Sequence, residues 1–499
     1  MSAVLGGPRF TRARCSADKP EPLVSPQGRR AILFLAYLQI PLVLAVSIFK
    51  DTFSPLIGLF LAGLGVLMTH FAVSPRRRHY TPLVWTLLFN LGCVLAFADL
   101  LVYEASYRSV PQPLTGAFSY TDSEMWRAVL VLSMGVASVL GAAFVGERVI
   151  AGRRPRAVAR PRFRGANGAL AAIVAWTVGS LALTLIMSAY GIGRTGIVNQ
   201  MELPFHLNGA LILARAYMVP SLGLLILDML IRNGLRSYAK IMVLSLIGVG
   251  FVCALTALSR GYLGILLITV ALYFAINAGR CGITSRVLLR YALGVTVPLV
   301  FAVFFITQLR VYGFGGQSVG IGSATSLAKS IDLNNPGEAA HLLISLATSR
   351  VGGLQELLGV LSAPDSWHLS NPYQFFMEHG DDIALIQKNV TGFVSDRDGV
   401  VATGQSLGLW GTLFLSGSPI VMCLGTMIYV LLSIGIEETF LRLNAGAVAL
   451  SVTVEAGITL WGFATYSHIL KIVEIAVVVF LAISFFIRHF AVTHNRQEA

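Results

Sequence analysis

Apolar runs of about 20 residues recur along this chain from Arg30 to the C-terminus. A helix of that length, rising ~1.5 Å per residue, crosses the ~30 Å hydrocarbon core of a bilayer. Hydrocarbon offers no hydrogen-bond partner, and a helix pairs its own backbone groups within a single run. The runs therefore predict an all-α fold, that of a polytopic integral membrane protein embedded in a lipid bilayer.

The composition excludes an ordinary soluble protein. Of the 499 residues, 55% are hydrophobic and 12% are charged, whereas soluble domains carry about 25% charged residues. The mean hydropathy is +0.74. We expect about twelve membrane-spanning helices. Their approximate limits are residues 31–49, 53–73, 81–103, 125–147, 167–190, 208–231, 240–258, 262–279, 288–309, 407–435, 443–465 and 469–488.

The positive charge of the chain predicts its orientation. The formal net charge is +13, and much of it lies in short segments between the apolar runs, at residues 76–78, 153–164, 232–240 and 280–290. Cytoplasmic loops of membrane proteins carry such an excess of arginine and lysine. We therefore expect these segments and both termini on the cytoplasmic face, and we do not expect a nucleic acid partner.

The same pattern divides the chain into four parts. Residues 1–30 are expected to form a disordered basic cytoplasmic tail, and residues 31–309 the first nine helices. Residues 310–405 are expected to form one large outer, periplasmic loop. Within it, residues 336–361 have amphipathic helical spacing and are expected to lie on the outer membrane surface or to cap the bundle. Residues 406–499 are expected to form the last three helices and a short tail.

Arginines collect on the expected outer side. Arg215 lies inside the sixth run, Arg260 lies in the tight turn between the seventh and eighth runs, and Arg194 precedes the sixth. Arg310 ends the ninth run, and Arg350 lies in the large loop. A guanidinium matches phosphate oxygens with a fork of donors and stays charged. The set therefore predicts an anionic ligand.

Two of these arginines have a purely structural alternative. Arg215 is costly inside an apolar run, and such an arginine usually faces a polar cavity. The structural alternative is an ion pair with Asp228 or Glu455. Arg260 is equally consistent with a snorkelling side chain that anchors the hairpin at the membrane surface. The sequence leaves both alternatives open.

The large loop carries candidate groups for proton transfer and sugar binding. Its segment "NPYQFFMEHGDD" contains Glu378 and His379 as candidate catalytic acceptors of a proton, with Asp382 and Tyr373 as candidate ligands of a glycan. No His-x-x-x-His pair and no Walker sequence occurs, so we expect neither a metal ion nor a cofactor. The chemistry that remains is metal-independent transfer from a phosphate-activated donor held in the membrane.

Three segments resemble the O-antigen polymerases, the Wzy-type oligosaccharide repeat-unit polymerases of bacteria, which are related to the O-antigen ligases. The segments are "MELPFHLNGALILARAYMVP" at residues 201–220, "SRG" at 259–261 and "GQSLGLWGTLFLSGSPIVMCLG" at 404–425. The resemblance covers roughly residues 165–435. The family typically has two arginine-rich outer loops, whereas here the loop at 191–207 contains Arg194 as its single arginine.

The resemblance implies a specific activity. Such polymerases transfer a growing glycan from undecaprenyl diphosphate onto a newly flipped lipid-linked repeat unit, without a metal, at the outer face of the bacterial inner membrane. It implies that Arg260 and Arg215 are the first-choice ligands of the diphosphate, followed by Arg310 and Arg350. It also implies a flippase and a chain-length regulator as partners.

Other functions remain open on the sequence alone. A lipid-linked glycan ligase would share the fold, the donor and the arginines, and would differ in the acceptor. A peptidoglycan polymerase of the SHEDS type would need an outer-loop aspartate, for which Asp332 or Asp365 would be the trial choice. A polysaccharide or lipid transporter is disfavoured because the chain shows no half-length repeat and its charges lean towards the outer surface.

Overall fold

The computed structural model describes residues 23–50, 53–102, 121–150, 161–163, 165–193, 203–204, 207–257, 259–278, 353–361, 408–462 and 466–493. These residues are helical, apart from short turns and one antiparallel pair of three-residue strands, β1 (Pro161–Phe163) and β2 (Ala491–Thr493). The longer helices are α1 (Pro26–Lys50), α2 (Pro55–Ala72), α3 (Thr81–Phe89), α6 (Asp122–Val149), α7 (Gly165–Ala189), α9 (Val219–Arg232), α10 (Arg236–Thr256), α11 (Arg260–Ile276), α20 (Pro419–Arg442), α21 (Gly446–Gly462) and α22 (Tyr466–Phe490).

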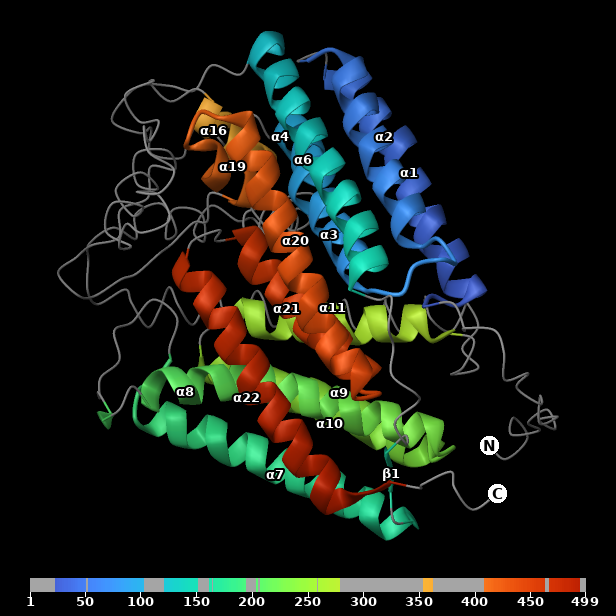
Figure 1. The fold of residues 1–499 in the computed structure, drawn as a ribbon, viewed down its shortest axis with the longest axis vertical. Coiled ribbons are helices and arrows are strands. Elements are labelled where there is room, and N and C mark those ends of the chain that lie inside the picture. The colour runs from blue at the N-terminus through green and yellow to red at the C-terminus, as the bar shows by residue number, and fades with distance from the viewer. Residues whose placement is uncertain are drawn as a thin grey trace, which may run out of the picture.

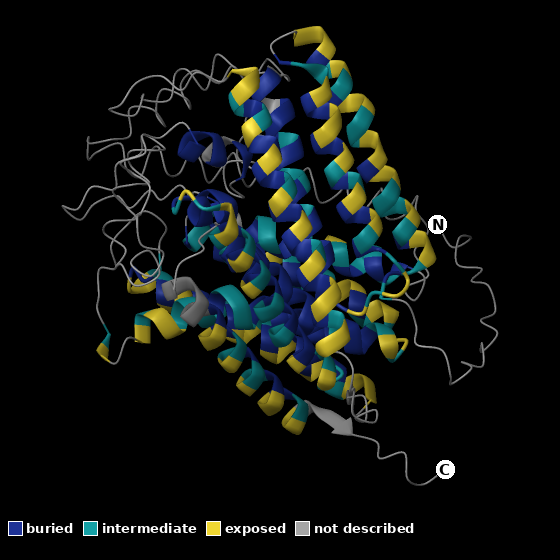
Figure 2. Cartoon of the chain, turned by 45° about the horizontal axis from the view of Figure 1, so that its top comes forward, coloured by how far each residue is buried: buried dark blue, intermediate teal, exposed yellow. Residues whose placement is uncertain are grey.

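The helices form the all-α membrane fold that the apolar runs predicted. Within the described part of the chain, 9 helical segments are long and apolar enough to cross a membrane. Helices α11 and α21 are also apolar but shorter. Many of their large apolar residues are exposed, among them Phe34, Phe49 and Leu130, and exposed positions recur along the outer sides of the helices (Figure 2). Such a surface is stable in lipid rather than in water. The chain is therefore a polytopic membrane protein.

Two groups of helices are joined by further helices (Figure 1). Helices α1, α2, α3 and α6 form one group, and α7, α9 and α10 form a second that crosses it at a large angle. Helices α20 and α21 join the two groups, because α20 packs along α6 while α21 contacts both α3 and α9. Helix α11 packs between α10, α21 and α1.

The expected tenth span, residues 407–435, is wrong as a single helix. The chain instead forms a short helix, α19 (Gly408–Phe414), and then α20. The break follows from the sequence between them, because Gly417 has a φ of +67° and Pro419 opens the next helix. Proline lacks the N–H that a helix interior needs and suits the first helical turn. The expected ninth span, 288–309, lies outside the described residues.

Two expected spans are interrupted by π-helical turns. The third contains η1 (Asn90–Leu95) between α3 and α4 (Ala96–Val102), and the sixth contains η4 (Ala214–Met218) between α8 (Leu207–Leu213) and α9. Pro220 explains the second interruption, since it cannot donate the hydrogen bond that the carbonyl four residues earlier would accept. Single π turns inside helices occur frequently at functional sites.

The described part of the amphipathic loop segment is buried. Helix α16 (Leu354–Leu361) packs against α19, α6 and α4, at the end of the molecule where α6 begins (Figure 1). Its side chains at Leu354, Leu357 and Leu358 have no exposed surface. Gly353, which precedes it, lies against the backbone of Gly92 in η1, where a Cβ would be 2.2 Å from the Gly92 carbonyl oxygen. The segment therefore caps the helix bundle here.

An aromatic cluster joins α3, α19 and α21. The ring centroids of Trp410 and Trp461 are 4.8 Å apart, and those of Trp85 and Trp461 are 5.8 Å apart, both in edge-to-face geometry. Phe89 completes the cluster at 5.9 Å from Trp410. Gly135 of α6 allows Trp410 to approach, because a Cβ there would lie 2.4 Å from the indole. Edge-to-face pairs add about 1 kcal/mol each to the burial of the rings.

A buried carboxylate fixes the turn between α2 and α3. Glu437, near the end of α20, accepts hydrogen bonds from the backbone N–H groups of Tyr80 and Thr81 and from the Thr81 hydroxyl. The Thr81 bonds are 2.8 and 2.7 Å long. They satisfy donors at the start of α3 that have no partner within the helix. The adjacent Glu438 binds His79 and Arg442, at 3.1 and 3.2 Å.

Basic segments gather at this end of the molecule, which we call the basic end. It comprises the α2–α3 turn, where Arg77 pairs with Glu147 at the end of α6, the α9–α10 turn and the end of α20. The end of α11 also lies here, because Tyr273 donates to Asp228 of α9. Ser259, which precedes α11, and the start of α6 lie at the other end of the molecule, because the far ends of these two helices are at the basic end. The described segments that we expect on the cytoplasmic face thus lie together at one end of the molecule.

The orientation can be tested with a matched pair of cysteines in a cysteine-free background. Ser237, at the basic end, and Ser123, at the start of α6, are both exposed. If the basic end is cytoplasmic, a membrane-impermeant maleimide added to intact spheroplasts will label Ser123→Cys and will label Ser237→Cys only after lysis. The reverse labelling pattern would contradict the predicted orientation.

Glu437→Ala should destabilise the fold. It leaves three buried donors without an acceptor, and the loss should be about 3 kcal/mol or more. The measurement is the temperature at which half of the detergent-solubilised protein remains monodisperse. Thr439→Ala, at an exposed position two residues along the same helix, is the matched control and should change that temperature little.

Candidate functional site

Of the site residues predicted from the sequence, Arg215 is the one whose side chain the structure describes. Arg260 is the first residue of α11, and its side chain lies outside the described set. The other candidates also lie outside the described residues, namely Arg194, Arg310, Arg350, Tyr373, Glu378, His379 and Asp382. Their roles therefore remain predictions, and the site is built here from the surroundings of Arg215.

Arg215 is buried in η4 and uses only part of its hydrogen-bonding capacity. Its side chain is among the largest fully buried ones in the described chain. Nη2 donates to the Gly193 carbonyl oxygen at 2.6 Å and to the Tyr262 hydroxyl at 3.4 Å. The guanidinium carbon lies 5.0 Å from the centroid of the Tyr262 ring, within range of a cation–π interaction. Nε and Nη1 have no hydrogen-bond partner among the described residues.

Gly193 makes this position of Arg215 possible. Its φ of +67° is in the left-handed region, and a Cβ there would lie 2.7 Å from Nη2. Glycine adopts that conformation without strain, and any other residue would also collide with the guanidinium. The turn at residues 190–193 thus supplies a carbonyl acceptor that holds one side of the arginine.

The structure excludes Asp228 as the ion-pair partner of Arg215. That carboxylate pairs instead with Arg232, at 2.8 Å, and accepts a hydrogen bond from Tyr273 at 2.9 Å. Arg215 also forms no ion pair with Glu455, although both line the same cavity. Within the described part of the chain, the Arg215 charge is therefore not neutralised by a carboxylate.

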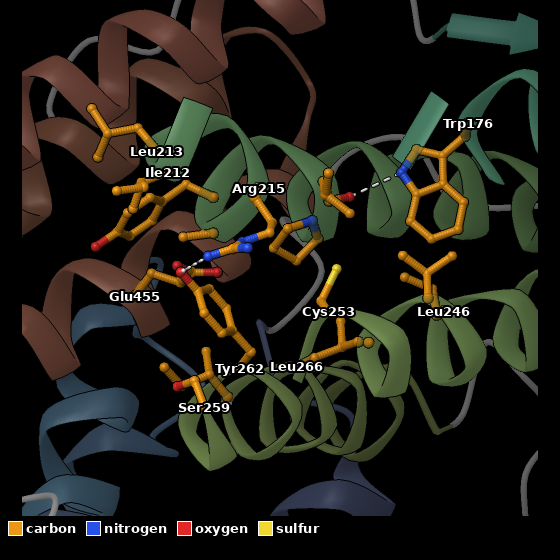
Figure 3. A pocket seen from close by; sticks show the side chains of 17 residues that line it. Trp176, Ile212, Leu213, Arg215, Leu246, Cys253, Ser259, Tyr262, Leu266 and Glu455 are labelled. Carbon is orange, nitrogen blue, oxygen red and sulfur yellow. Dashed lines mark hydrogen bonds between the residues drawn. The ribbon is translucent and has the colours of Figure 1, made fainter. Parts of the chain in front are cut away.

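The cavity has a volume of about 280 Å³ and lies between η4, α7, α10, α11 and α21. Its wall is mostly apolar, with Trp176 at one side (Figure 3). Polar groups enter it at Arg215, Tyr217, Ser259, Tyr262 and Glu455. An apolar cavity with a few converging polar groups is the usual form of a small-molecule site.

The cavity lies in the half of the molecule away from the basic end. Ser259, in the turn that joins α10 to α11, lines it, and Arg260 follows as the first residue of α11. On the α10 side the wall is Leu246, Val249, Gly250 and Cys253, in the second half of that helix. Trp176 is held in place because its Nε1 donates to the Val219 carbonyl at 2.9 Å.

Sequence reasoning missed most of the residues that surround Arg215. The sequence pattern indicates Glu455 only as a structural partner of Arg215, and it does not single out Tyr217 or Tyr262. A signal for Glu455 did exist, since it is the single charged residue in the apolar helix Gly446–Trp461 and such residues usually face a cavity or partner. No sequence pattern predicts the contact of Arg215 with Gly193, which lies 22 residues earlier in the chain.

Comparisons of the chain with models of protein families, with curated proteins and with solved structures found no match. Among the described residues, no group of three or more His, Cys, Asp and Glu side chains is placed to hold a metal ion. The chemistry of the site is therefore argued from its own geometry.

Arg215→Met should leave the fold nearly as stable as the wild type. The native arginine is a buried charge without a carboxylate partner among the described residues, so its removal relieves a desolvation cost that offsets the lost bond to Gly193, with a net change within about 1 kcal/mol. Thermal unfolding of the solubilised protein is the measurement. Asp228→Ala, which breaks a satisfied carboxylate site, should cost about 2 kcal/mol. A larger loss for Arg215→Met than for Asp228→Ala would mean that Arg215 is mainly structural.

Proposed function

We propose that this protein polymerises oligosaccharide repeat units carried on undecaprenyl diphosphate, as a metal-independent glycosyltransferase at the outer face of the bacterial inner membrane. The observation that supports this most is the buried Arg215, whose Nε and Nη1 have no described partner and whose cavity lies in the half away from the basic end. Membrane-buried arginines usually face a cavity that serves a substrate.

A diphosphate fits the charge and the donors of this site. Arg215 offers several N–H groups in a fixed plane, which suit phosphate oxygens better than a point charge does. The start of α11, at Ser259 and Arg260, lies beside the cavity, and the first N–H groups of a helix favour an anion. Arg260, and Arg310 and Arg350 after it, are the proposed further ligands.

The reaction needs no metal in this scheme. The acceptor hydroxyl attacks the anomeric carbon of the donor sugar, the bond from that carbon to the diphosphate oxygen breaks, and the diphosphate leaves with its added negative charge. Arg215 stabilises that charge in a site of low polarity, where such an interaction is strong. The aromatic wall, with Trp176, Tyr217 and Tyr262, suits a sugar or an isoprenoid chain next to the diphosphate.

A lipid-linked glycan ligase is the second candidate, because the same cavity would serve the same donor. The two functions differ in the acceptor. A transporter would also bind a lipid-linked glycan, but it would not need to stabilise a leaving group.

Deleting the gene separates these functions. Surface glycan and lipid-linked intermediates are compared by gel in the deletion strain and in the complemented strain. Single repeat units at the surface, with loss of long chains, are expected for a polymerase. Long chains that remain on undecaprenyl diphosphate would show a ligase, and single lipid-linked units retained inside the cell would show a transporter.

Gly193→Ala should impair polymerisation although it lies outside the cavity wall. The added Cβ meets the Arg215 Nη2 and displaces the guanidinium, and a displacement of ~1 Å can cost about 100-fold in rate. Polymer formation is measured in membrane vesicles at matched protein levels. Gly209→Ala, on α8, is the control, since a Cβ there meets nothing within 4 Å. Equal rates for the two variants would contradict the role given to Arg215.

A further inference from the structure

Glu455 stands apart from the other buried acids of the described chain. Asp228, Glu437 and Glu438 are buried, and each binds side-chain or backbone partners within the protein. Glu455 is 5% exposed, and no described residue forms a hydrogen bond or an ion pair with it. A buried carboxylate without a protein partner is costly unless the site it faces supplies one.

Glu455 shares its cavity with Arg215, which also has no ion-pair partner among the described residues. The two side chains enter from different elements, α21 and η4 (Figure 3). Opposite charges that line one cavity of about 280 Å³ without pairing leave room for a ligand that meets both. Such a ligand accepts hydrogen bonds at one place and donates one at another, as a hydroxyl beside a phosphate group does.

We propose that Glu455 is the catalytic base, the group that takes the proton of the acceptor hydroxyl. This role rests on the function proposed above, in which no residue had yet been assigned to remove the proton of the acceptor hydroxyl. The hydroxyl oxygen forms the new bond to the anomeric carbon while its proton passes to the Glu455 carboxylate. The bond from that carbon to the diphosphate oxygen breaks, and Arg215 holds the charge that leaves. The protonated Glu455 then returns its proton to water.

The surroundings of Glu455 suit this role. It lies beyond the midpoint of α21, away from the basic end at which that helix begins, in the same half of the molecule as Ser259 and Arg215. Tyr217 lines the same cavity, and its hydroxyl lies 3.4 Å from the hydroxyl of Thr459, one turn along α21 from Glu455. The base and the anion site thus lie on packed helical elements, η4 and α21, which are in contact with each other.

The test compares Glu455→Gln with wild type in two measurements. Polymer formation from the cell's own lipid-linked units, in membrane vesicles, should fall by about 10²–10⁴-fold, the usual contribution of a general base. The stabilisation of the purified protein by inorganic pyrophosphate against heat should stay as in wild type, because Arg215 is intact. Arg215→Met should lose both. Glu437→Gln, a buried acid outside the cavity, is the control and should retain the rate per molecule of folded protein.

Two results would overturn the role of Glu455 while leaving the polymerase in place. These are a rate for Glu455→Gln within tenfold of wild type, or the loss of pyrophosphate stabilisation in that variant. If Glu455→Gln does not accumulate in the membrane, Glu455→Asp is measured instead. Its carboxylate is withdrawn by one methylene, which should slow polymer formation measurably. A full wild-type rate for Glu455→Asp would refute the proposal. Normal long chains in the gene-deletion strain would instead refute the polymerase itself.

Discussion

A polar group buried among packed helices has no water to bind, and this constraint determines where the charges of this protein lie. At the basic end two buried carboxylates find partners within the protein, because Glu437 accepts from the start of α3 and Glu438 binds His79 and Arg442. These contacts join α20 to the α2–α3 turn and hold two helix groups in register. Without them the turn would expose buried donors to an apolar interface.

The cavity contains two buried ionisable side chains that described groups do not pair. Arg215 and Glu455 are both buried there, and neither has an ion-pair partner among the described residues. Folding energy alone would favour apolar residues at both positions. The proposed substrate, a lipid-linked glycan diphosphate, carries the charge and the hydroxyl groups that would give both side chains a partner.

Departures from regular helix occur next to both the cavity and the aromatic cluster. The π turn η4 carries Arg215 and precedes Pro220, while η1 lies against Gly353 and the capping helix α16. The break at Gly417 lets α19 place Trp410 against Trp461. At η4 and at the α19–α20 break a proline or glycine frees the backbone from the regular ladder, and the freed segments carry Arg215 and Trp410.

Much of the fold class followed from the sequence by itself. The apolar runs and the basic segments between them determined an all-α membrane protein, because hydrocarbon imposes the same length and polarity on every span. The tertiary structure alone decided that Gly193 supports Arg215, that Asp228 belongs to Arg232 and Tyr273, and that Glu455 faces the arginine's cavity. These pairings depend on the angle at which distant helices cross and on the rotation of each helix about its own axis. An apolar run determines neither quantity, since every face of an apolar helix is equally stable against lipid.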